Sequence, residues 1–350
     1  MVSREGVRHF ARFGAAAMLA LAAVALPLLA RAGIGSTVLP PRGEDGPVTV
    51  FYPAAEAEQV RQVGLHRLQF AWDGTPVRGN GRLVVISHGS GGGSTPHSDL
   101  AKQLATAGFV VALPEHRGDN WRDMRDVGPA SWKRRPAEVS RAIDTIAATP
   151  RLAALLSLDR VGVHGMSAGG HTALTLAGGR WSPHVLRRHC ETHLDTDFHA
   201  CVGTLLELRG GALDGLKKAV VRAALPFAMG DTRWYAHQDP RIAAIVAQVP
   251  LAADFDLDSL KQPRVPLGIV QAGRDAWLAP HLHSGAVLRA CTGCTLVADL
   301  PGAGHASFLS PQPVVDGTAG RLLADPPGFD RALVPQVHAR IVAFFRQHLE

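Results

Sequence analysis

The chain alternates short, continuously apolar runs with longer stretches in which apolar residues recur every three or four positions. Apolar runs of about four to eight residues between turn signals are typical of buried parallel strands. The sequence predicts such strands at residues 82–87, 109–113, 160–165, 242–250, 265–271 and 295–300. Two further strands precede them, at residues 48–52 and 65–72, and we expect these two to form an antiparallel pair.

Helices are predicted between and after these strands, at residues 98–107, 136–148, 167–177 and 336–348. The second of them has Val139, Ile143 and Ile146 on one face, and a proline at its first position is well tolerated. The alternation of strands and helices indicates an α/β domain with a mostly parallel central sheet and helices on both faces. Residues 179–241 interrupt the alternation, and we interpret them as a cap inserted over the site.

Residues 1–32 have the organisation of a secretory signal peptide. Arginines precede a long apolar run, and Ala30-Arg31-Ala32 supplies the small residues of a cleavage site. We therefore expect residues 33–350 to form one exported domain, periplasmic or secreted, without stable membrane insertion. An uncleaved N-terminal membrane anchor is the alternative.

Composition and charge exclude several other classes of protein. The 350 residues are 46% hydrophobic, which is too apolar for a disordered chain. Without the leader the net charge falls from +6 to +3, and no basic stripe with interleaved aromatic residues remains. We therefore expect no nucleic-acid partner.

Export makes disulfides the simplest interpretation of the four cysteines. Cys190 and Cys201 flank a short segment, and Cys291 and Cys294 form a Cys-x-x-Cys pair, so we predict two local disulfides. A metal site is the weaker alternative, because its ligands lack the spacing of zinc sites. Those ligands would be His189, Cys190, His193, His199 and Cys201. We expect neither a metal nor a cofactor.

The strongest chemical signal is the segment Gly165-Met166-Ser167-Ala168-Gly169-Gly170. It lies where a predicted strand ends and a predicted helix begins, which is the context in which Gly-x-Ser-x-Gly presents a nucleophilic serine. A nucleophilic serine requires a base and an acid that orients the base. His305 and Asp275 each follow a predicted strand, and we expect them in these roles. Asp254 and Asp256 remain alternatives for the acid.

Glycines at residues 89 and 91–93 follow the first buried strand and allow a backbone to approach a bound carbonyl. The N–H groups of Ser90 and Ala168 are the candidate donors of an oxyanion hole. Other residues near these motifs are expected to be structural. We interpret His88, His164 and His171 as core or supporting histidines, and His116, Arg117 and Asp119 as parts of a solvated loop. Trp121, Trp132, Trp181 and Trp234 fit either an acyl pocket or ordinary packing.

These residues together resemble the α/β-hydrolase superfamily, in particular exported dienelactone-hydrolase-like proteins related to platelet-activating-factor acetylhydrolase. The resemblance spans residues 48–348 and is carried by four motifs: RLVVISHGSGGG at 82–93, DRVGVHGMSAGG at 159–170, GIVQAGRD at 268–275 and PGAGH at 301–305. It implies hydrolysis of esters by the triad Ser167, Asp275 and His305, with the Ser90 and Ala168 amides as oxyanion donors.

Two features depart from the relatives. Dienelactone hydrolases have a cysteine where this chain has Ser167, so a dienelactone substrate does not follow. Acetylhydrolases take their acid from the strand before the one that precedes Asp275, and residues 242–250 contain no aspartate. We predict an exported serine hydrolase that cleaves small to medium carboxylic esters. A serine peptidase or amidase, and a catalytically silent binding protein with this fold, are the alternatives.

Overall fold

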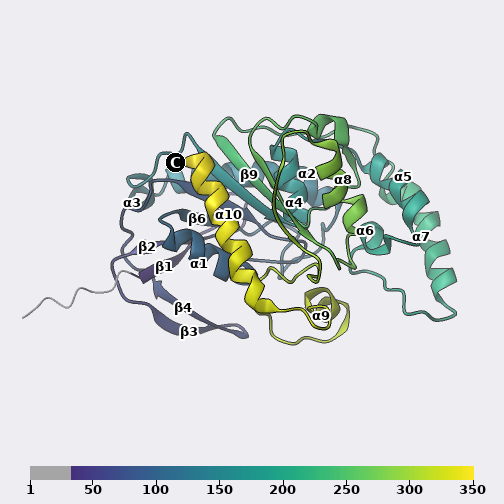
Figure 1. Ribbon diagram of the computed structural model, residues 1–350, viewed down its shortest axis with the longest axis horizontal. Coiled ribbons are helices and arrows are strands. Elements are labelled where there is room, and N and C mark those ends of the chain that lie inside the picture. The colour runs from purple at the N-terminus through teal and green to yellow at the C-terminus, as the bar shows by residue number, and fades with distance from the viewer. Residues whose placement is uncertain (1–32) are drawn as a thin grey trace, which may run out of the picture. The chain divides into compact units, whose positions relative to one another are not determined.

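The computed structural model describes residues 33–350, and the expected signal peptide at 1–32 lies outside the described residues (Figure 1). Its main feature is a ten-stranded sheet with the order β12-β11-β9-β7-β5-β6-β2-β1-β4-β3. The strands from β12 to β6 in this order run parallel to one another. These parallel strands are β5 (Leu83–Ser87), β6 (Val110–Pro114), β7 (Val161–Met166), β9 (Ile242–Gln248), β11 (Leu267–Ala272) and β12 (Thr295–Leu300). The predicted parallel core is therefore confirmed.

The N-terminal strands differ from the prediction. β2 (Val48–Ala54) and β4 (His66–Trp72) do not pair with each other, because β1 (Gly33–Leu39) lies between them. β1 is antiparallel to β2 and parallel to β4, and β3 (Gln59–Val63) forms a hairpin with β4. The pattern did not reveal β1, since its sequence GIGSTVL opens with two glycines and lacks a continuous apolar run.

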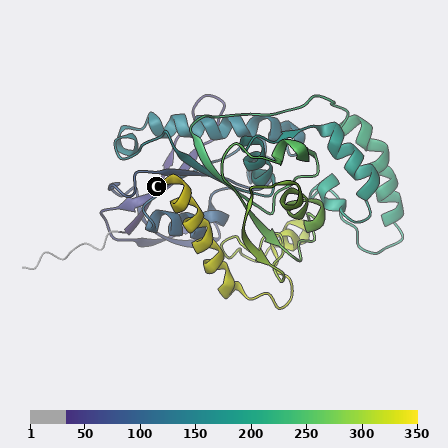
Figure 2. The ribbon, with the colours of Figure 1, turned by 45° about the horizontal axis from the view of Figure 1, so that its top comes forward.

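Helices cover both faces of the sheet, as expected (Figures 1 and 2). Alternate residues of β5 point to opposite faces. Val84 and Ile86 belong to the cluster that includes α1 (Ser98–Thr106) and α10 (Val334–Leu349). Leu83 and Val85 belong to the cluster that includes α2 (Pro129–Ala147), α4 (Ala168–Leu176) and α8 (Ser284–Ala290). The remaining short helices are α3 (Pro150–Ala153) and α9 (Gly317–Leu323).

The predicted start of α2 at Pro136 is wrong. The helix begins at Pro129, directly after Gly128, and Pro136 lies in its interior. A proline there removes one helical hydrogen bond. The two additional turns bury Ser131, Trp132 and Arg135, and this packing offsets the loss.

Residues 179–241 contain the short strand β8 (Arg180–Trp181) and the helices α5 (Pro183–His193), α6 (Phe198–Val202) and α7 (Asp214–Ala228). We call these residues the inserted segment. β8 pairs with β10 (Phe255–Asp256), just beyond β9. The segment lies on the side of the molecule opposite β1–β4 (Figures 1 and 2). Disulfides join Cys190 to Cys201 within it, and Cys291 to Cys294 after α8.

Within residues 33–350, none of the helices combines the length and the apolar composition that crossing a bilayer requires.

Candidate active site

Ser167 lies in a sharp turn between the end of β7 and the first residue of α4. Its backbone has φ 58° and ψ −118°, a conformation that costs a residue with a side chain about 1–3 kcal/mol. A Cβ at Gly165 would collide with the carbonyl oxygen of Gly169, and a Cβ at Gly169 would collide with that of Ser87. Only glycine fits these two positions, so the spacing of the motif follows directly from the tightness of the turn.

His305 connects Ser167 to Asp275. Its Nε2 lies 2.9 Å from Ser167 Oγ, and its Nδ1 lies 2.7 Å from Asp275 Oδ2. The Asp275 carboxylate accepts a hydrogen bond from Nδ1–H, which keeps the proton on Nδ1 and leaves the Nε2 lone pair directed at the serine hydroxyl. His305 and Asp275 are buried and Ser167 is half-buried, so Ser167 is the most exposed of the three residues.

The loop after β11 fixes the carboxylate of Asp275. Its Oδ1 accepts the backbone N–H groups of Trp277 and Leu278, at 2.8 and 2.9 Å. Oδ2 therefore remains directed at His305. The two alternative acids lie elsewhere: Asp254 Oδ2 is 3.0 Å from His171 Nε2, and Asp256 pairs with Arg180.

The glycine loop after β5 lies directly against the nucleophile turn. A Cβ at Gly89 would be 3.4 Å from Ser167 Cβ. Within residues 33–350, the N–H groups of Ser90 and Ala168 donate no hydrogen bond to the protein. Both N–H groups are therefore free to donate to a bound oxyanion.

A buried ion pair stabilises this glycine loop. Arg135 is fully buried in α2 and donates to the carbonyl oxygen of His88 at 2.5 Å and to Asp119 Oδ2 at 2.8 Å. Asp119 in turn accepts the N–H of Gly91 at 2.9 Å and the hydroxyl of Ser131 at 2.8 Å. Burial alone would raise the pKa of Asp119, but Arg135 and the hydrogen-bond donors outweigh it and lower that pKa.

This network corrects one expectation. His116 and Asp119 are completely buried and do not belong to a solvated loop, whereas Arg117 is at the surface and pairs with Glu44. Arg135 and Glu138 were not predicted to contribute to the site. Continuing the spacing of Val139 and Ile143 toward the N-terminus places Arg135 on the apolar face of α2, and a charge on that face was the available signal.

His88 has structural contacts, as expected. Its Nδ1 donates to the carbonyl oxygen of Gly89, and its Nε2 accepts the N–H of His116. The His116 ring lies between Ser87 Oγ at 2.7 Å and Glu138 Oε2 at 2.6 Å. Burial and the nearby Arg135 lower the pKa of His116 well below its usual range, and burial raises the pKa of Glu138 to about 7. Both shifts have the direction that favours the uncharged pair, in which Glu138 keeps its proton and His116 is neutral.

The remaining candidate histidines and tryptophans are mostly packing residues. His171 contacts Trp132, Trp181 and Phe255, and all four of these rings are buried. His164 is buried 3.4 Å from Gln248. Trp234 is half-exposed beside Arg180. Trp121 differs from these residues, because it is 63% exposed and lies against the glycine loop at Gly93.

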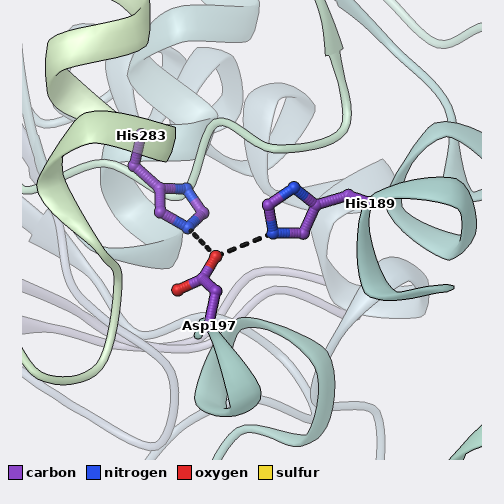
Figure 3. A group of neighbouring side chains, drawn as sticks. All are labelled: His189, Asp197 and His283. Carbon is purple, nitrogen blue, oxygen red and sulfur yellow. Dashed lines mark hydrogen bonds and ion pairs between the residues drawn. The ribbon is translucent and has the colours of Figure 1, made fainter. Parts of the chain in front are cut away.

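The cysteine-containing metal site is not formed, since Cys190 and Cys201 are bonded to each other. A different cluster, shown in Figure 3, contains His189, Asp197 and His283. Both histidine Nε2 atoms lie close to Asp197 Oδ2, at 2.7 and 2.8 Å. A histidine that binds a metal normally donates a proton from its other nitrogen. His283 Nδ1 instead accepts the N–H of Ala252 at 3.0 Å, so Nε2 carries the proton and the cluster does not fit a metal ion.

One comparison with known proteins bears on this site. A family model described as platelet-activating factor acetylhydrolase, isoform II, matches residues 62–122. The matched residues contain β4, β5, the glycine loop, α1 and β6, and they end before Ser167. This family is part of the α/β-hydrolase superfamily, and the mostly parallel sheet surrounded by helices agrees with that fold. The chain therefore has an α/β-hydrolase fold, and the match indicates an ester hydrolase of the serine esterase or lipase type.

Asp119→Asn tests the role of the buried ion pair. The variant leaves Arg135 buried without a charged partner and weakens the bond to the Gly91 N–H, so the glycine loop should shift. We expect the kcat for ester hydrolysis to fall about 10–100-fold, because small displacements at a reacting centre have effects of this size. Steady-state kinetics and circular dichroism measure activity and folding. Asp144→Asn, an exposed carboxylate on α2, is the control, and a folded Asp119→Asn enzyme with unchanged kcat would contradict the interpretation.

Glu138→Gln tests the buried proton. The folded protein retains a proton on Glu138 that the unfolded chain releases near its ordinary pKa of 4.5, so the contribution of Glu138 to stability falls as the pH rises from 4.5 to about 7 and stays constant above. Glutamine is uncharged throughout. We expect both proteins to be equally stable at pH 4.5 and the variant to be more stable at pH 8, by on the order of 3 kcal/mol. Urea unfolding at both pH values measures this difference. The exposed Glu44→Gln is the control, and a variant less stable at pH 8 than at pH 4.5 relative to the wild type would refute the prediction.

Proposed function

We propose that this protein is a serine esterase that cleaves carboxylic esters through an acyl-enzyme on Ser167. The observation that carries the proposal is the hydrogen-bonded chain from Ser167 through His305 to Asp275. The strained turn at Ser167 supports the same assignment, as do the N–H groups of Ser90 and Ala168, which have no acceptor among residues 33–350.

In this proposal His305 Nε2 removes the hydroxyl proton while Ser167 Oγ bonds to the ester carbonyl carbon. The carbonyl electron pair moves to the oxygen, and the Ser90 and Ala168 N–H groups stabilise the oxyanion. When the electron pair returns, the bond to the alcohol oxygen breaks and His305 gives its proton to that oxygen. A water molecule then repeats both steps on the acyl-enzyme, which releases the acid and restores Ser167. Asp275 keeps His305 in the required tautomer throughout.

The residues beside the glycine loop favour an apolar substituent on the ester. Trp121 and Met124 are 63% and 49% exposed, and their side chains lie against Gly93 and Gly91. Exposed apolar side chains next to an oxyanion loop gain free energy when a substrate covers them. We propose that they contact the chain of a small to medium ester, and that the inserted segment limits the length of that chain.

We also propose that the protein acts outside the cytoplasm. The two disulfides fit an oxidising compartment, and the sequence of residues 1–32 fits a signal peptide.

Ser167→Ala tests the nucleophile. We expect the wild-type protein to hydrolyse p-nitrophenyl esters. In a series of acetate, butyrate, hexanoate, octanoate and palmitate it should prefer the short and medium acyl chains. The variant should lose at least roughly 10³-fold in kcat and all labelling by a fluorophosphonate probe, because both reactions need the serine oxygen. Ser157→Ala, an exposed serine after α3, should behave as wild type. A wild-type protein that neither cleaves any ester nor reacts with the probe would favour a binding protein, and cleavage restricted to anilides would favour an amidase.

Trp121→Ala tests the apolar contact. Loss of the indole should lower kcat/KM for the hexanoate ester about 10-fold and for the acetate ester less than about 2-fold, because only the longer chain reaches the ring. Leu65→Ala removes an apolar side chain of similar exposure from the turn between β3 and β4, on the side of the molecule opposite the inserted segment, and is the control. An equal loss on both esters would indicate that Trp121 supports the glycine loop and does not contact the acyl chain.

A further inference from the structure

We infer that Asp197 of the inserted segment is a positioning residue for the catalytic acid. It joins the loop that carries Asp275 to the end of β9 and so fixes the acid relative to the nucleophile turn. The inference rests on the proposed function, in which Asp275 orients His305.

The first connection runs from Asp197 to the acid loop. Asp197 Oδ1 accepts the N–H of Ala279 at 3.0 Å. Ala279 follows Trp277 and Leu278, whose N–H groups bind Asp275 Oδ1. Three backbone donors within the turn are therefore held by two carboxylates, one from the loop itself and one from the inserted segment. The Trp277 ring also packs against His199 of α6, with ring centroids 3.9 Å apart.

The second connection runs from Asp197 to the nucleophile turn. Asp197 Oδ2 accepts a hydrogen bond from His283 Nε2–H at 2.8 Å (Figure 3). His283 Nδ1 accepts a hydrogen bond from the N–H of Ala252 at 3.0 Å. The preceding residue, Leu251, donates its N–H to the carbonyl oxygen of Ser167 at 3.2 Å. A short path of hydrogen bonds therefore links the acid loop to the backbone of the nucleophile.

Burial, hydrogen bonds and a disulfide hold Asp197 itself in place. It is 3% exposed, and α6 begins at the next residue. His189 of α5 donates to the same oxygen as His283, and the disulfide between Cys190 and Cys201 joins α5 to α6. Burial alone would raise the pKa of Asp197, but the hydrogen bonds from His189 and His283 outweigh it, so the residue is a carboxylate at neutral pH. Asparagine has one acceptor oxygen and cannot replace these contacts.

The experiment compares Asp197→Asn in two backgrounds. In the wild-type background we expect the kcat for ester hydrolysis to fall about 10–100-fold, because the acid loop loses its anchor. In an Asp275→Asn background the same change should lower kcat less than about 2-fold, since residues that act as a unit are not additive. Any loss of melting temperature should be equal in the two backgrounds. A purely structural role would instead lower kcat by the same factor in both, and would overturn the inference.

Further variants serve as controls. Asp195→Asn removes an exposed carboxylate two residues away, which pairs with Lys218, and should leave kcat unchanged. If Asp197→Asn does not fold, His189→Ala removes one donor to Asp197 and should lower kcat by a smaller factor. His189→Gln restores an N–H donor and should recover activity.

Two other outcomes are distinct. Stoichiometric zinc that is bound by the wild type and lost in Asp197→Asn would overturn the inference in favour of a metal site. Failure of the proposed function would appear differently, as a wild-type protein without esterase activity and without fluorophosphonate labelling.

Discussion

The left-handed backbone of Ser167 is the constraint on which the rest of the site depends. A serine does not hold φ 58° unless its surroundings impose it. The backbone packs closely at Gly165 and Gly169, where no side chain would fit. The N–H of Ser167 donates a hydrogen bond to the carbonyl oxygen of Gln248, and the N–H of Leu251 donates one to the carbonyl oxygen of Ser167. Apart from Gly169, which lies in the first turn of α4, these contacts come from the parallel strands β5, β7 and β9 or from residues just beyond them. The strained turn therefore depends on the sheet placing three strand ends side by side.

Burial of charge beneath the glycine loop is the second constraint. Removing a guanidinium and a carboxylate from water costs several kcal/mol for each ion, and good geometry must compensate for this. Arg135 and Asp119 meet the requirement by bonding to each other and to Ser131, His88 and the Gly91 N–H. Such a pair contributes little net stability. Its hydrogen bonds hold the backbone of the glycine loop at His88 and Gly91, as the proposed oxyanion hole requires.

The sequence predicted the parallel strands, the serine turn and the positions of Asp275 and His305, because each is encoded locally or by chain order. A strand followed by Gly-x-Ser-x-Gly can be recognised without knowledge of its neighbours. β1 could not be recognised in this way, since its glycines and polar residues are stabilised by pairing with β2 and β4. The roles of Arg135 and Asp197 depend on contacts with residues far away in the chain, such as His88 and Ala279. The sequence marks Arg135 as a charge on an apolar helix face, but it does not identify the distant partners of Arg135 or Asp197.

Three carboxylates around the site, those of Asp119, Asp197 and Asp275, all accept hydrogen bonds from backbone N–H groups of loops. Asp119 accepts an N–H of the glycine loop, Asp275 accepts two from its own loop, and Asp197 accepts one from the same loop. Loops beyond strand ends lack the hydrogen bonds of a sheet, and their N–H groups need other acceptors. A buried carboxylate supplies two acceptor oxygens and binds N–H donors more strongly than a neutral group does. Asp119 lies in the loop after β6 and is paired with Arg135 of α2, and Asp197 lies in the inserted segment, so both carboxylates are outside the loops they stabilise. Substitutions in α2 and in the inserted segment are therefore expected to alter the proposed ester hydrolysis without changing Ser167, His305 or Asp275.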